Sequence, residues 1–528
     1  MSGPERVQLE HSDSTIAPHK KKTKSFETPV PSLTIVAHPN PSRIGERVLL
    51  SGLDKGATVA LSRREPMFKP PGKSLGRALD DPFISREPLL LRSDGKSAVF
   101  LDRGKGKIDV ICNGTPTESG WFFSRQQLEV GVMLVLAERV VLLLHLTRWK
   151  NKPTSGDHGL VGYSDSILFL RAEIERVADL TTPVLLRGAT GSGKELVASA
   201  IHEAGRPGKP FVCVNLAALP SSLAAAELFG SVKGAFTGSE RNQLGYFRSA
   251  QNGTLFLDEV GEASLEIQVM LLRALETGEV TPLGSQASFK VNARLVAATD
   301  ANLETMMADD SFKTPLFHRL AGYEITLPTL IDRLEDFGRL FIHFAAMELD
   351  KLGENHLLQP RGTDDPWLPT DLMQRLLSYS WPGNVRQLRN TVSQLLIGCR
   401  GESSLHSVPN LEDMLASKPE PPATPVSVPQ PLPIKRKPST IPSDELILTM
   451  KHNHWDIKAT AAQLGISRPA LYLLIAQTPG LRTAADLSAD EIEEGLARHS
   501  GDVQALADEL MVSPRALRRR ISQTGPAS

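Results

Sequence analysis

The sequence predicts a multidomain chain with an all-β N-terminal part, a central α/β part containing a parallel sheet, and an all-α C-terminal part. Three observations support this. Residues 31–147 alternate short β-branched and apolar runs with Gly, Pro and Asp turns. From about residue 160 to 410, apolar strands precede amphipathic helices, the pattern of a parallel sheet covered by helices. Residues 444–477 align with residues 490–523 as two copies of one helical unit.

The composition is that of a soluble globular protein. The 528 residues are 41% hydrophobic and 23% charged, and a chain of this length forms several separate cores. The three cysteines lie far apart without metal-ligand spacing, so we expect packing residues rather than a disulfide framework or a zinc site. The N-terminus has no apolar core of a secretory signal, and we expect a cytoplasmic protein.

One apolar stretch, from residue 130 to 146, needs a separate explanation. Glu138 and Arg139 interrupt it, and a membrane span needs about 20 apolar residues. The stretch therefore predicts two short buried strands joined by a turn.

Changes of composition along the chain predict its domain boundaries. We expect a disordered arm over residues 1–30, a β domain over 31–147, an α/β domain with a helical lid (from about 330) over 158–412, a proline-rich linker over 416–443, and helical units over 444–480 and 488–524. In each helical unit the third helix would begin at a natural N-cap, Ser467 or Ser513. This is the layout of a helix-turn-helix.

A glycine-rich segment follows the apolar strand VLLR and opens a helix. This context makes its G-x4-G-K match a phosphate loop, whose backbone N–H groups cradle phosphates while Lys194 neutralises their charge; a structural glycine turn is the minor alternative. We expect a nucleotide to bind Gly188, Ala189, Thr190, Gly191, Ser192, Gly193, Lys194 and Glu195. Because Glu195 stands where many phosphate loops have Ser or Thr, Mg²⁺ must depend more on a second, acidic site.

The acidic site follows the apolar strand GTLFL and consists of Asp258 and Glu259. In a phosphate-loop ATPase, Asp258 would hold Mg²⁺ and Glu259 would polarise the attacking water. Two acids after an apolar strand are often a solvated strand end, but their place behind a phosphate loop favours catalysis. The expected cofactors are therefore ATP and Mg²⁺.

The segment GAFTGS at 234–239, preceded by ELFGSVK, is a more specific mark. Through it and the two motifs above, the region from about 160 to 412 resembles the AAA+ domain of bacterial enhancer-binding proteins, the activators of sigma-54 RNA polymerase. The resemblance implies an ATPase that works as a hexameric ring at enhancer DNA and remodels the sigma-54 closed complex. It also implies that sigma-54 contacts Gly234, Ala235, Phe236, Thr237 and Gly238.

The same resemblance implies roles for other residues around the nucleotide. Asn215 would switch Glu259 between engaged and idle states, and Arg386 in the segment WPGNVR would reach the γ-phosphate. Thr299 and Asp300 hold the sensor I position, where the family generally has Asn in place of Asp300. An ionised carboxylate there would repel the γ-phosphate, so slow or conditional hydrolysis is one expectation.

Two further residues resemble the family's pair of arginines that act across a subunit interface. Arg319 matches the second of them, whereas Lys313 stands in the first place. Lysine keeps the charge but lacks the planar fork that binds phosphate bidentately. The resemblance therefore implies weaker stabilisation from the neighbouring subunit.

The β domain resembles a forkhead-associated domain, a β-sandwich that binds phosphothreonine. The matching pairs are Gly76-Arg77, Ser85-Arg86 and Asn113-Gly114, although Pro88 stands where that family has His. The resemblance implies phosphopeptide binding by Arg77, Ser85, Arg86 and Asn113, and control by Ser/Thr phosphorylation. The alternative is a sandwich kept only as a docking module.

The first helical unit resembles the Fis-type helix-turn-helix that usually ends these activators, through ATAAQLGISRPALY. The residues expected to contact DNA are Ser467, Arg468 and Tyr472 in the first copy and Arg515, Arg518 and Arg519 in the second. The denser basic face of the second copy suits phosphates and guanine edges. For any one of these arginines, the alternative is a solvated basic helix.

Together these features predict a cytoplasmic, ATP-hydrolysing activator of sigma-54 transcription, bound to enhancer DNA as a homo-oligomer and not to a membrane. Two alternatives stay open. One is a DNA-bound scaffold or repressor in which ATP is a structural ligand, and the other is an AAA+ remodeller of another substrate. The Asp258–Glu259 pair speaks against the scaffold, and the Phe236–Thr237 tip against the remodeller.

Overall fold

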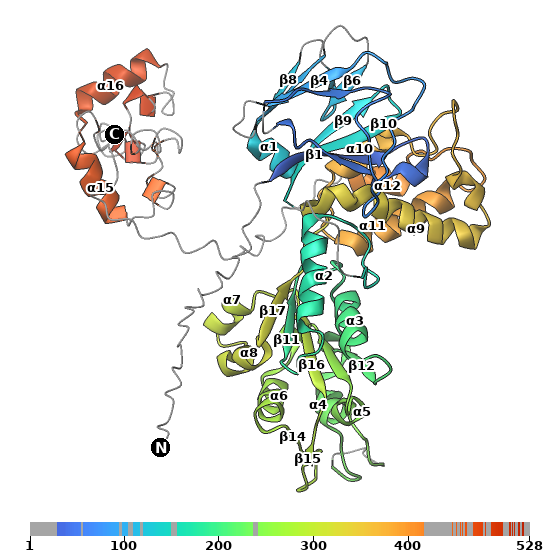
Figure 1. Ribbon diagram of the computed structural model, residues 1–528. Helices are drawn as coiled ribbons and strands as arrows, with labels where there is room; N and C mark the ends of the chain where they lie inside the picture. Colours follow the sequence, from blue (N-terminus) through green and yellow to red (C-terminus); the bar gives the residue numbers. More distant parts are fainter. Residues whose placement is uncertain are drawn as a thin grey trace, which may run out of the picture. The chain divides into compact units, whose positions relative to one another are not determined.

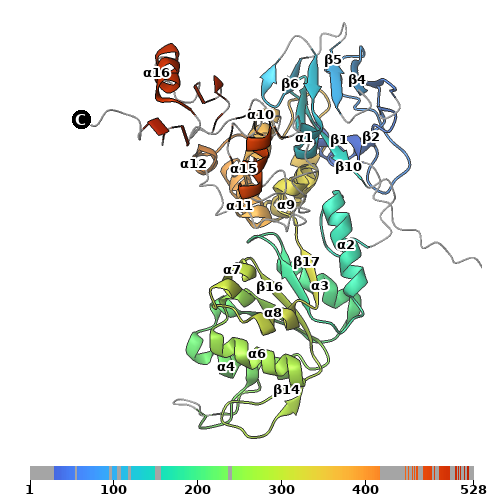
Figure 2. The same cartoon turned by 90° about the vertical axis from the view of Figure 1, so that its left-hand side faces the viewer.

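The structure is a computed structural model that describes residues 29–416, apart from 54–55, 94–97, 104–108, 117–119, 149–155 and 236–240, and parts of 446–521. The chain divides into two compact units, Met1–Pro422 and Ala423–Ser528. The first unit contains a sheet-rich N-terminal domain, a parallel α/β layer and a helical lid (Figure 1 and Figure 2). Among the described residues, no helix is long and apolar enough to cross a membrane.

Two antiparallel sheets form the N-terminal domain, called here the sandwich. The larger sheet has the order β2-β1-β10-β9-β6-β7, with strands at Arg47–Leu49, Val30–Ala37, Val140–Thr147, Val132–Leu136, Val110–Cys112 and Thr115–Pro116. The smaller has the order β3-β4-β5-β8, with strands at Val59–Leu61, Leu89–Ser93, Val99–Asp102 and Trp121–Phe123. Two short helices accompany them, η1 (Pro41–Arg43) and α1 (Arg125–Val130). The N-terminal part is therefore sheet-rich, as the sequence predicts.

The central strands of the larger sheet are apolar on both faces. Leu142 and Leu144 of β10 join a core with Leu89 of the smaller sheet, whereas Val141 and Leu143 join the core of the lid. A sheet with one solvated face alternates apolar and polar residues, but β10 runs as VVLLL because both of its faces are covered. The strands β9 and β10 are antiparallel neighbours, which confirms the pair of strands predicted over residues 130–146.

A five-stranded parallel sheet forms the α/β layer, as predicted. Its order is β12-β13-β16-β11-β17, with strands at Phe211–Asn215, Thr254–Asp258, Arg294–Thr299, Val184–Arg187 and Tyr323–Thr326. Helices α2 (Asp165–Val177) and α3 (Lys194–Gly205) pack on the face that carries Phe256. The face with Leu255 and Leu257 is covered by α4 to α8, at Ser221–Phe229, Tyr246–Ser249, Leu265–Thr277, Leu303–Ala308 and Thr314–Leu320. Shorter elements are η3 (Leu216–Ala218), η4 (Val260–Glu262) and the hairpin of β14 (Glu279–Val280) and β15 (Phe289–Lys290).

The lid follows β17. Its helices are η5 (Ile331–Asp336), α9 (Phe337–Leu352), η6 (Asn355–Leu358), α10 (Thr370–Ser378), α11 (Asn384–Gly398) and α12 (Pro409–Ala416). Trp367 and Trp381 are buried in its core, and the same core takes in Val36, Val141 and Leu143 from the sandwich. Sandwich and lid thus share one hydrophobic core, and both views show the sandwich against the lid helices (Figure 1 and Figure 2).

The second unit contains two similar hydrophobic clusters and, within its described residues, the helices α15 (Arg468–Gln477) and α16 (Ala489–Arg498). One cluster includes Leu446, Ala461 and Leu471, and the other includes Ile492, Ala507 and Leu517. These positions correspond one to one when the two sequence copies are aligned. Each copy therefore buries the same positions.

Two of the three cysteines are buried. Cys112 and Cys399 pack in the cores, whereas Cys213 lies exposed on β12, the edge strand of the parallel sheet. The prediction that all three are packing residues is wrong for Cys213, because an edge strand is covered less completely than the strands inside the sheet.

Candidate functional site

The predicted phosphate loop joins β11 to α3. Gly193 has a φ of 104°, and Lys194 begins the helix with only 7% of its surface exposed. Gly191 has a φ of 72°, and a Cβ there would lie 2.2 Å from the carbonyl oxygen of Gly383, so a side chain does not fit. Oγ of Ser192 is buried without a hydrogen-bond partner among the described residues. A helix N-terminus next to an unpartnered buried hydroxyl group fits a phosphate ligand.

Four charged side chains meet beside this loop. Nζ of Lys194 lies 3.4 Å from Oε1 of Glu259 and donates to the carbonyl oxygen of Gly188 at 3.0 Å. Asp258 ends β13, and Asp300 follows β16. Burial raises the pKa of Glu259; the charge of Lys194 opposes this shift, and Asp300 and Asp258 add to it. The cluster therefore combines a phosphate-binding cation with a carboxyl group suited to accept a proton.

The backbone around these acids is constrained. Glu259 adopts the left-handed conformation, with φ 54° and ψ 50°, which is strained for a residue other than Gly. Thr299 is buried, and its Oγ1 accepts from the amide of Ala301 at 3.0 Å. Asn215 lies opposite Asp258 in the sheet, and its Oδ1 caps η3 through the amide of Ala218 at 3.2 Å. In this structure the Asn215 side chain is thus engaged at the cap.

The lid reaches the phosphate loop through the start of α11. Nδ2 of Asn384 donates to the carbonyl oxygen of Thr190 at 3.0 Å, while its Oδ1 accepts from the amide of Leu330 at 2.9 Å. The amide of Arg386 donates to the carbonyl oxygen of Gly191 at 3.3 Å. Sequence reasoning assigned Arg386 but missed Asn384, although both lie in the segment WPGNVR. A polar residue at the beginning of an amphipathic helix was the available signal.

A hollow of about 450 Å³ opens between the phosphate loop and the lid. Its walls include Thr190, Gly191, Arg386, Gln387, Asn390 and Met414. Amide and guanidinium groups around a phosphate loop suit a nucleotide. No group of three or more His, Cys, Asp or Glu side chains in the described part of the chain could hold a metal ion by itself.

The base of the GAFTGS segment is described, although its tip is not. Ser231 and Gln243 pair through two backbone hydrogen bonds, of 3.0 and 2.8 Å. Gly230 and Gly245 pack so closely that a Cβ on Gly245 would lie 2.3 Å from the amide nitrogen of Gly230. Figure 1 and Figure 2 show this base beside β14 and β15, at the end of the α/β layer far from the lid. Gly234 and Ala235 are described, whereas Phe236, Thr237 and Gly238 lie outside the described residues.

Comparison with known proteins identifies the central region. Residues 160–326 match the sigma-54 interaction domain, and residues 332–425 match the AAA+ ATPase lid domain. The central region is a sigma-54 interaction domain with its AAA+ lid. It includes the phosphate loop, the acidic cluster, the GAFTGS segment and Asn384.

Two sequence relatives agree with this result. The nitric oxide reductase transcription regulator NorR1 of Cupriavidus necator is 42% identical over 276 residues, which cover 52% of this chain and 52% of the relative. The anaerobic nitric oxide reductase transcription regulator NorR of Citrobacter koseri is 42% identical over 242 residues, 46% of each chain. The chain thus matches about half the length of these curated relatives. A crystal structure of NtrX from Brucella abortus with ADP aligns over 70% of each chain, with 26% identity and a TM-score of 0.42.

Two basic residues of the sigma-54 interaction domain lie on α8. Lys313 is the N-cap of this helix, and Arg319 lies in its last turn. The side chain of Arg319 is 55% exposed, and its Nη2 lies 3.7 Å from Oε1 of Glu276. An exposed ion pair of this length contributes little to stability.

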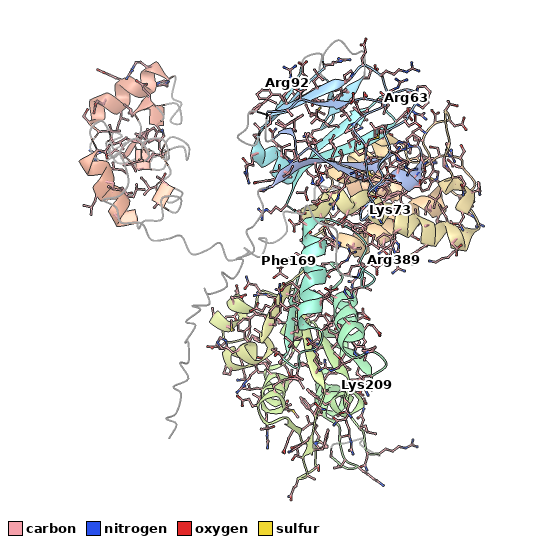
Figure 3. The ribbon with its side chains drawn as sticks, viewed as in Figure 1. Arg63, Lys73, Arg92, Phe169, Lys209 and Arg389 are labelled. Carbon is pink, nitrogen blue, oxygen red and sulfur yellow. The ribbon has the colours of Figure 1, made fainter. Side chains whose placement is uncertain are left out.

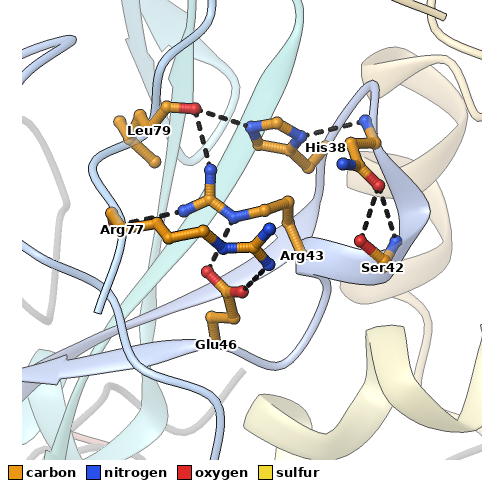
Figure 4. Close-up of polar contacts among 7 residues, drawn as sticks. His38, Ser42, Arg43, Glu46, Arg77 and Leu79 are labelled. Atoms are coloured by element: carbon orange, nitrogen blue, oxygen red, sulfur yellow. Dashed lines mark hydrogen bonds and ion pairs between the residues drawn. The ribbon is translucent and has the colours of Figure 1, made fainter. Parts of the chain in front are cut away.

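Two of the four residues predicted to bind a phosphopeptide line one hollow of the sandwich. Ser85 and Arg86 line a hollow of about 370 Å³ on the sandwich, and the second arginine of that hollow is Arg63. Arg77 is not in its lining; its Nη2 lies 2.5 Å from Oε1 of Glu46 (Figure 4). Arg63 lies two residues after β3, and its amide donates to the carbonyl oxygen of Ser85 at 3.0 Å. Figure 3 shows Arg63 on the sandwich.

Arg77 lies at the exposed edge of a hydrogen-bonded network, with 56% of its side chain exposed. Arg43 donates from Nε to Glu46 at 2.7 Å and from Nη1 to the carbonyl oxygen of Leu79 at 3.0 Å (Figure 4). His38 shares the Leu79 carbonyl oxygen at 3.1 Å, and burial lowers the pKa of His38 to about 4. The network fixes the chain just before residue 80.

Asn113 is also absent from the lining of the hollow. It adopts a φ of 45° and binds Met133 twice: its amide donates to the Met133 carbonyl oxygen at 3.0 Å, and its Oδ1 accepts from the Met133 amide at 2.8 Å. This side chain is therefore occupied in holding the β6–β7 turn against β9.

Most residues predicted to contact DNA cannot be placed. Ser467, Arg515, Arg518 and Arg519 lie outside the described residues. Arg468 begins α15, and Tyr472 on the same helix is 47% exposed. The DNA contacts stay a prediction.

Proposed function

We propose that this chain is a sigma-54-dependent transcription regulator, which hydrolyses ATP with Mg²⁺ in an oligomeric ring and thereby remodels the sigma-54 RNA polymerase closed complex at enhancer DNA. The observation that carries the proposal is the cluster of Lys194, Asp258 and Glu259 beside a phosphate loop, within a sigma-54 interaction domain. The regulatory names of the relatives support the same assignment.

In the proposed mechanism, the residues of the chain bind phosphate, orient water and move a proton. The amides of residues 188–194 hold the phosphates, and Lys194 turns from Glu259 toward them. Glu259, which loses the neutralising charge of Lys194, then takes a proton from the attacking water. Mg²⁺ bound by Asp258 would neutralise negative charge on the phosphates.

The other proposed roles concern contacts with neighbouring copies and with partner molecules. An exposed Arg319 would complete the site of a neighbouring copy, which requires a ring such as a hexamer. The segment from Gly234 to Gly238 would contact sigma-54 at the end of the domain far from the lid. The two helical units of the C-terminal part would bind enhancer DNA. A phosphothreonine protein would bind the sandwich hollow, with Arg63 and Arg86 as the cations.

One observation favours a second candidate, an ATP-binding but hydrolysis-impaired scaffold or repressor. Asp300 contributes to the raised pKa of Glu259, so a second carboxyl group acts on the residue that must serve as the base. If this pair persists with nucleotide bound, Glu259 cannot orient water.

Measuring ATP hydrolysis by the full chain distinguishes the active regulator from the hydrolysis-impaired scaffold. We would measure ATP turnover against protein concentration, together with capture of sigma-54 in the presence of ADP-aluminium fluoride. The regulator predicts turnover that rises cooperatively with concentration, is lost in Glu259→Gln and is kept in Glu262→Gln, the matched change at an exposed acid of η4. Nucleotide binding without turnover or capture would instead favour the scaffold.

A further inference from the structure

The sandwich and the lid meet at the turn between β9 and β10. Ala137 and Glu138 form this turn with φ values of 50° and 52°, and Arg139 follows them. Nη2 of Arg139 donates to the carbonyl oxygens of Gly362 and Asp364 in the lid, each at 3.0 Å. Arg139 is thus a sandwich residue whose guanidinium group is hydrogen-bonded to the backbone of the lid.

A second bond runs from the lid to the same turn. Oγ1 of Thr370, the first residue of α10, donates to the carbonyl oxygen of Glu138 at 3.1 Å. Because α10 and β10 also share the apolar core, these polar bonds fix the register in which the two surfaces pack.

Arg139 also contacts residues that line the sandwich hollow or lie next to its lining. Its Nε lies 3.0 Å from Oδ2 of Asp81, and both side chains are buried. The guanidinium carbon lies 4.4 Å from the ring centre of Phe83, and Oδ1 of Asp81 accepts from the amide of Phe83 at 2.9 Å. Phe83, Arg86 and Ala137 line the hollow. A single buried guanidinium group therefore touches the hollow's wall on one side and the lid on the other.

The lid in turn touches the phosphate loop. Asn384 and Arg386 at the start of α11 hold the carbonyl oxygens of Thr190 and Gly191. The helices α9 and α11 pack together in the core that the sandwich shares. Any movement of α11 that accompanies a nucleotide must shift this core, because packed interiors are close to incompressible.

We infer that Arg139 couples the sandwich hollow to the nucleotide site, so that occupancy of the hollow sets how firmly the lid is held and a nucleotide in turn alters the hollow. The arginine pair Arg63 and Arg86 makes an anionic group the expected occupant. The inference rests on the proposed binding of nucleotide at the phosphate loop. Coupling of this kind is reciprocal, so it can be tested from the nucleotide side without knowing the occupant.

The first experiment uses hydrogen exchange of the full chain without nucleotide. In Arg139→Gln, we expect exchange across residues 361–370 to rise roughly tenfold, because hydrogen bonds from a charged donor are among the strong ones. The matched control is Arg92→Gln, at an exposed arginine of β4 (Figure 3). Unchanged exchange in Arg139→Gln would overturn the inference. If that variant does not fold, Thr370→Val tests the same connection from the lid side.

The second experiment adds ADP. In the wild-type chain, ADP should protect residues 188–195 and also change exchange over residues 80–86; in Arg139→Gln the first effect should persist and the second should disappear. A change over 80–86 that survives in the variant, or its absence in the wild type, would overturn the coupling. If ADP fails to protect residues 188–195, the proposed nucleotide function fails, and the first experiment alone decides whether Arg139 holds the lid.

Discussion

Replacing Asp336 should destabilise the first unit more than any surface change near it. Asp336 is 2% exposed; its Oδ1 accepts from the amide of Tyr163 at 2.6 Å, and both oxygens accept from the amide of Ser164 at 3.1 Å. A Cβ on Gly162 would lie 2.4 Å from Oδ2, so the segment before α2 passes directly over the carboxylate. Burial lowers the pKa of Arg333, and Asp336 opposes that shift. Asp336 thus connects the lid to the segment that leads into α2.

The size of the stability loss follows from the amide groups that would lose their hydrogen-bond acceptor. Asp336→Ala leaves two buried N–H donors unsatisfied, at about 2 kcal/mol each, so the free energy of unfolding should fall by about 4 kcal/mol. Asp336→Asn keeps one acceptor oxygen and should cost about 2 kcal/mol. The matched control is Asp332→Ala, which removes an exposed cap on Thr329 and should cost about 1 kcal/mol.

Urea denaturation of the full chain, followed by tryptophan fluorescence, measures these losses. Trp367 and Trp381 are suitable reporters because both are buried in the lid core. A loss in Asp336→Ala no greater than in Asp332→Ala would refute the reasoning. Equal losses in the Ala and Asn variants would mean that the charge, rather than the number of acceptors, carries the effect.

Three further predictions concern pH and catalysis. Burial lowers the pKa of His38 and His145 from 6.5 to about 4, so the unfolded chain binds protons at a higher pH than the folded chain. The free energy of unfolding, which is full above pH 6.5, should therefore fall by about 1.4 kcal/mol per pH unit per histidine toward pH 4. Urea denaturation curves at pH 7 and pH 5 test this, and His145→Gln should reduce the pH dependence. Glu259→Gln should lose at least ~100-fold in ATP turnover while a fluorescent ATP analogue still binds; equal loss of binding would contradict its role as a base. Arg319→Ala and Lys194→Ala should each lack ATP turnover. A mixture of the two variants should recover part of it, because a Lys194→Ala subunit still supplies Arg319 to its neighbour. No recovery in mixtures that co-assemble would contradict action between subunits.

The nucleotide cluster could be predicted from the sequence because its signals are local. A glycine-rich turn between an apolar strand and a helix requires positive φ angles, which only Gly adopts without strain, so Gly191 and Gly193 mark the turn by themselves. Asp258 ends the strand β13 directly after the apolar run Leu-Phe-Leu, Glu259 follows it, and parallel strands end at the same edge as the phosphate loop. Strand and helix periodicity likewise predicted the parallel sheet.

Contacts between distant segments could not be predicted in the same way. Arg63 and Arg77 both lie in polar loops, and only the folded sandwich brings Arg63 beside Ser85 and leaves Arg77 with Glu46. Asp300 was recognised as unusual, but its effect on the pKa of Glu259 depends on the pairing of β16 with β13. Pairing across such distances depends on backbone paths that no short motif encodes.

By itself, the sequence determined the elements of this protein: the phosphate loop, the acidic strand end, the repeated helical units and the strands of the sandwich. Its run VVLLL even indicated that β10 is covered on both faces, without naming what covers it. Only the tertiary structure decided that the second cover is the AAA+ lid, and that Arg139 spans the contact between them. The physical reason is that apolar burial is non-directional: a strand can require a partner surface, but which surface meets it depends on the whole fold.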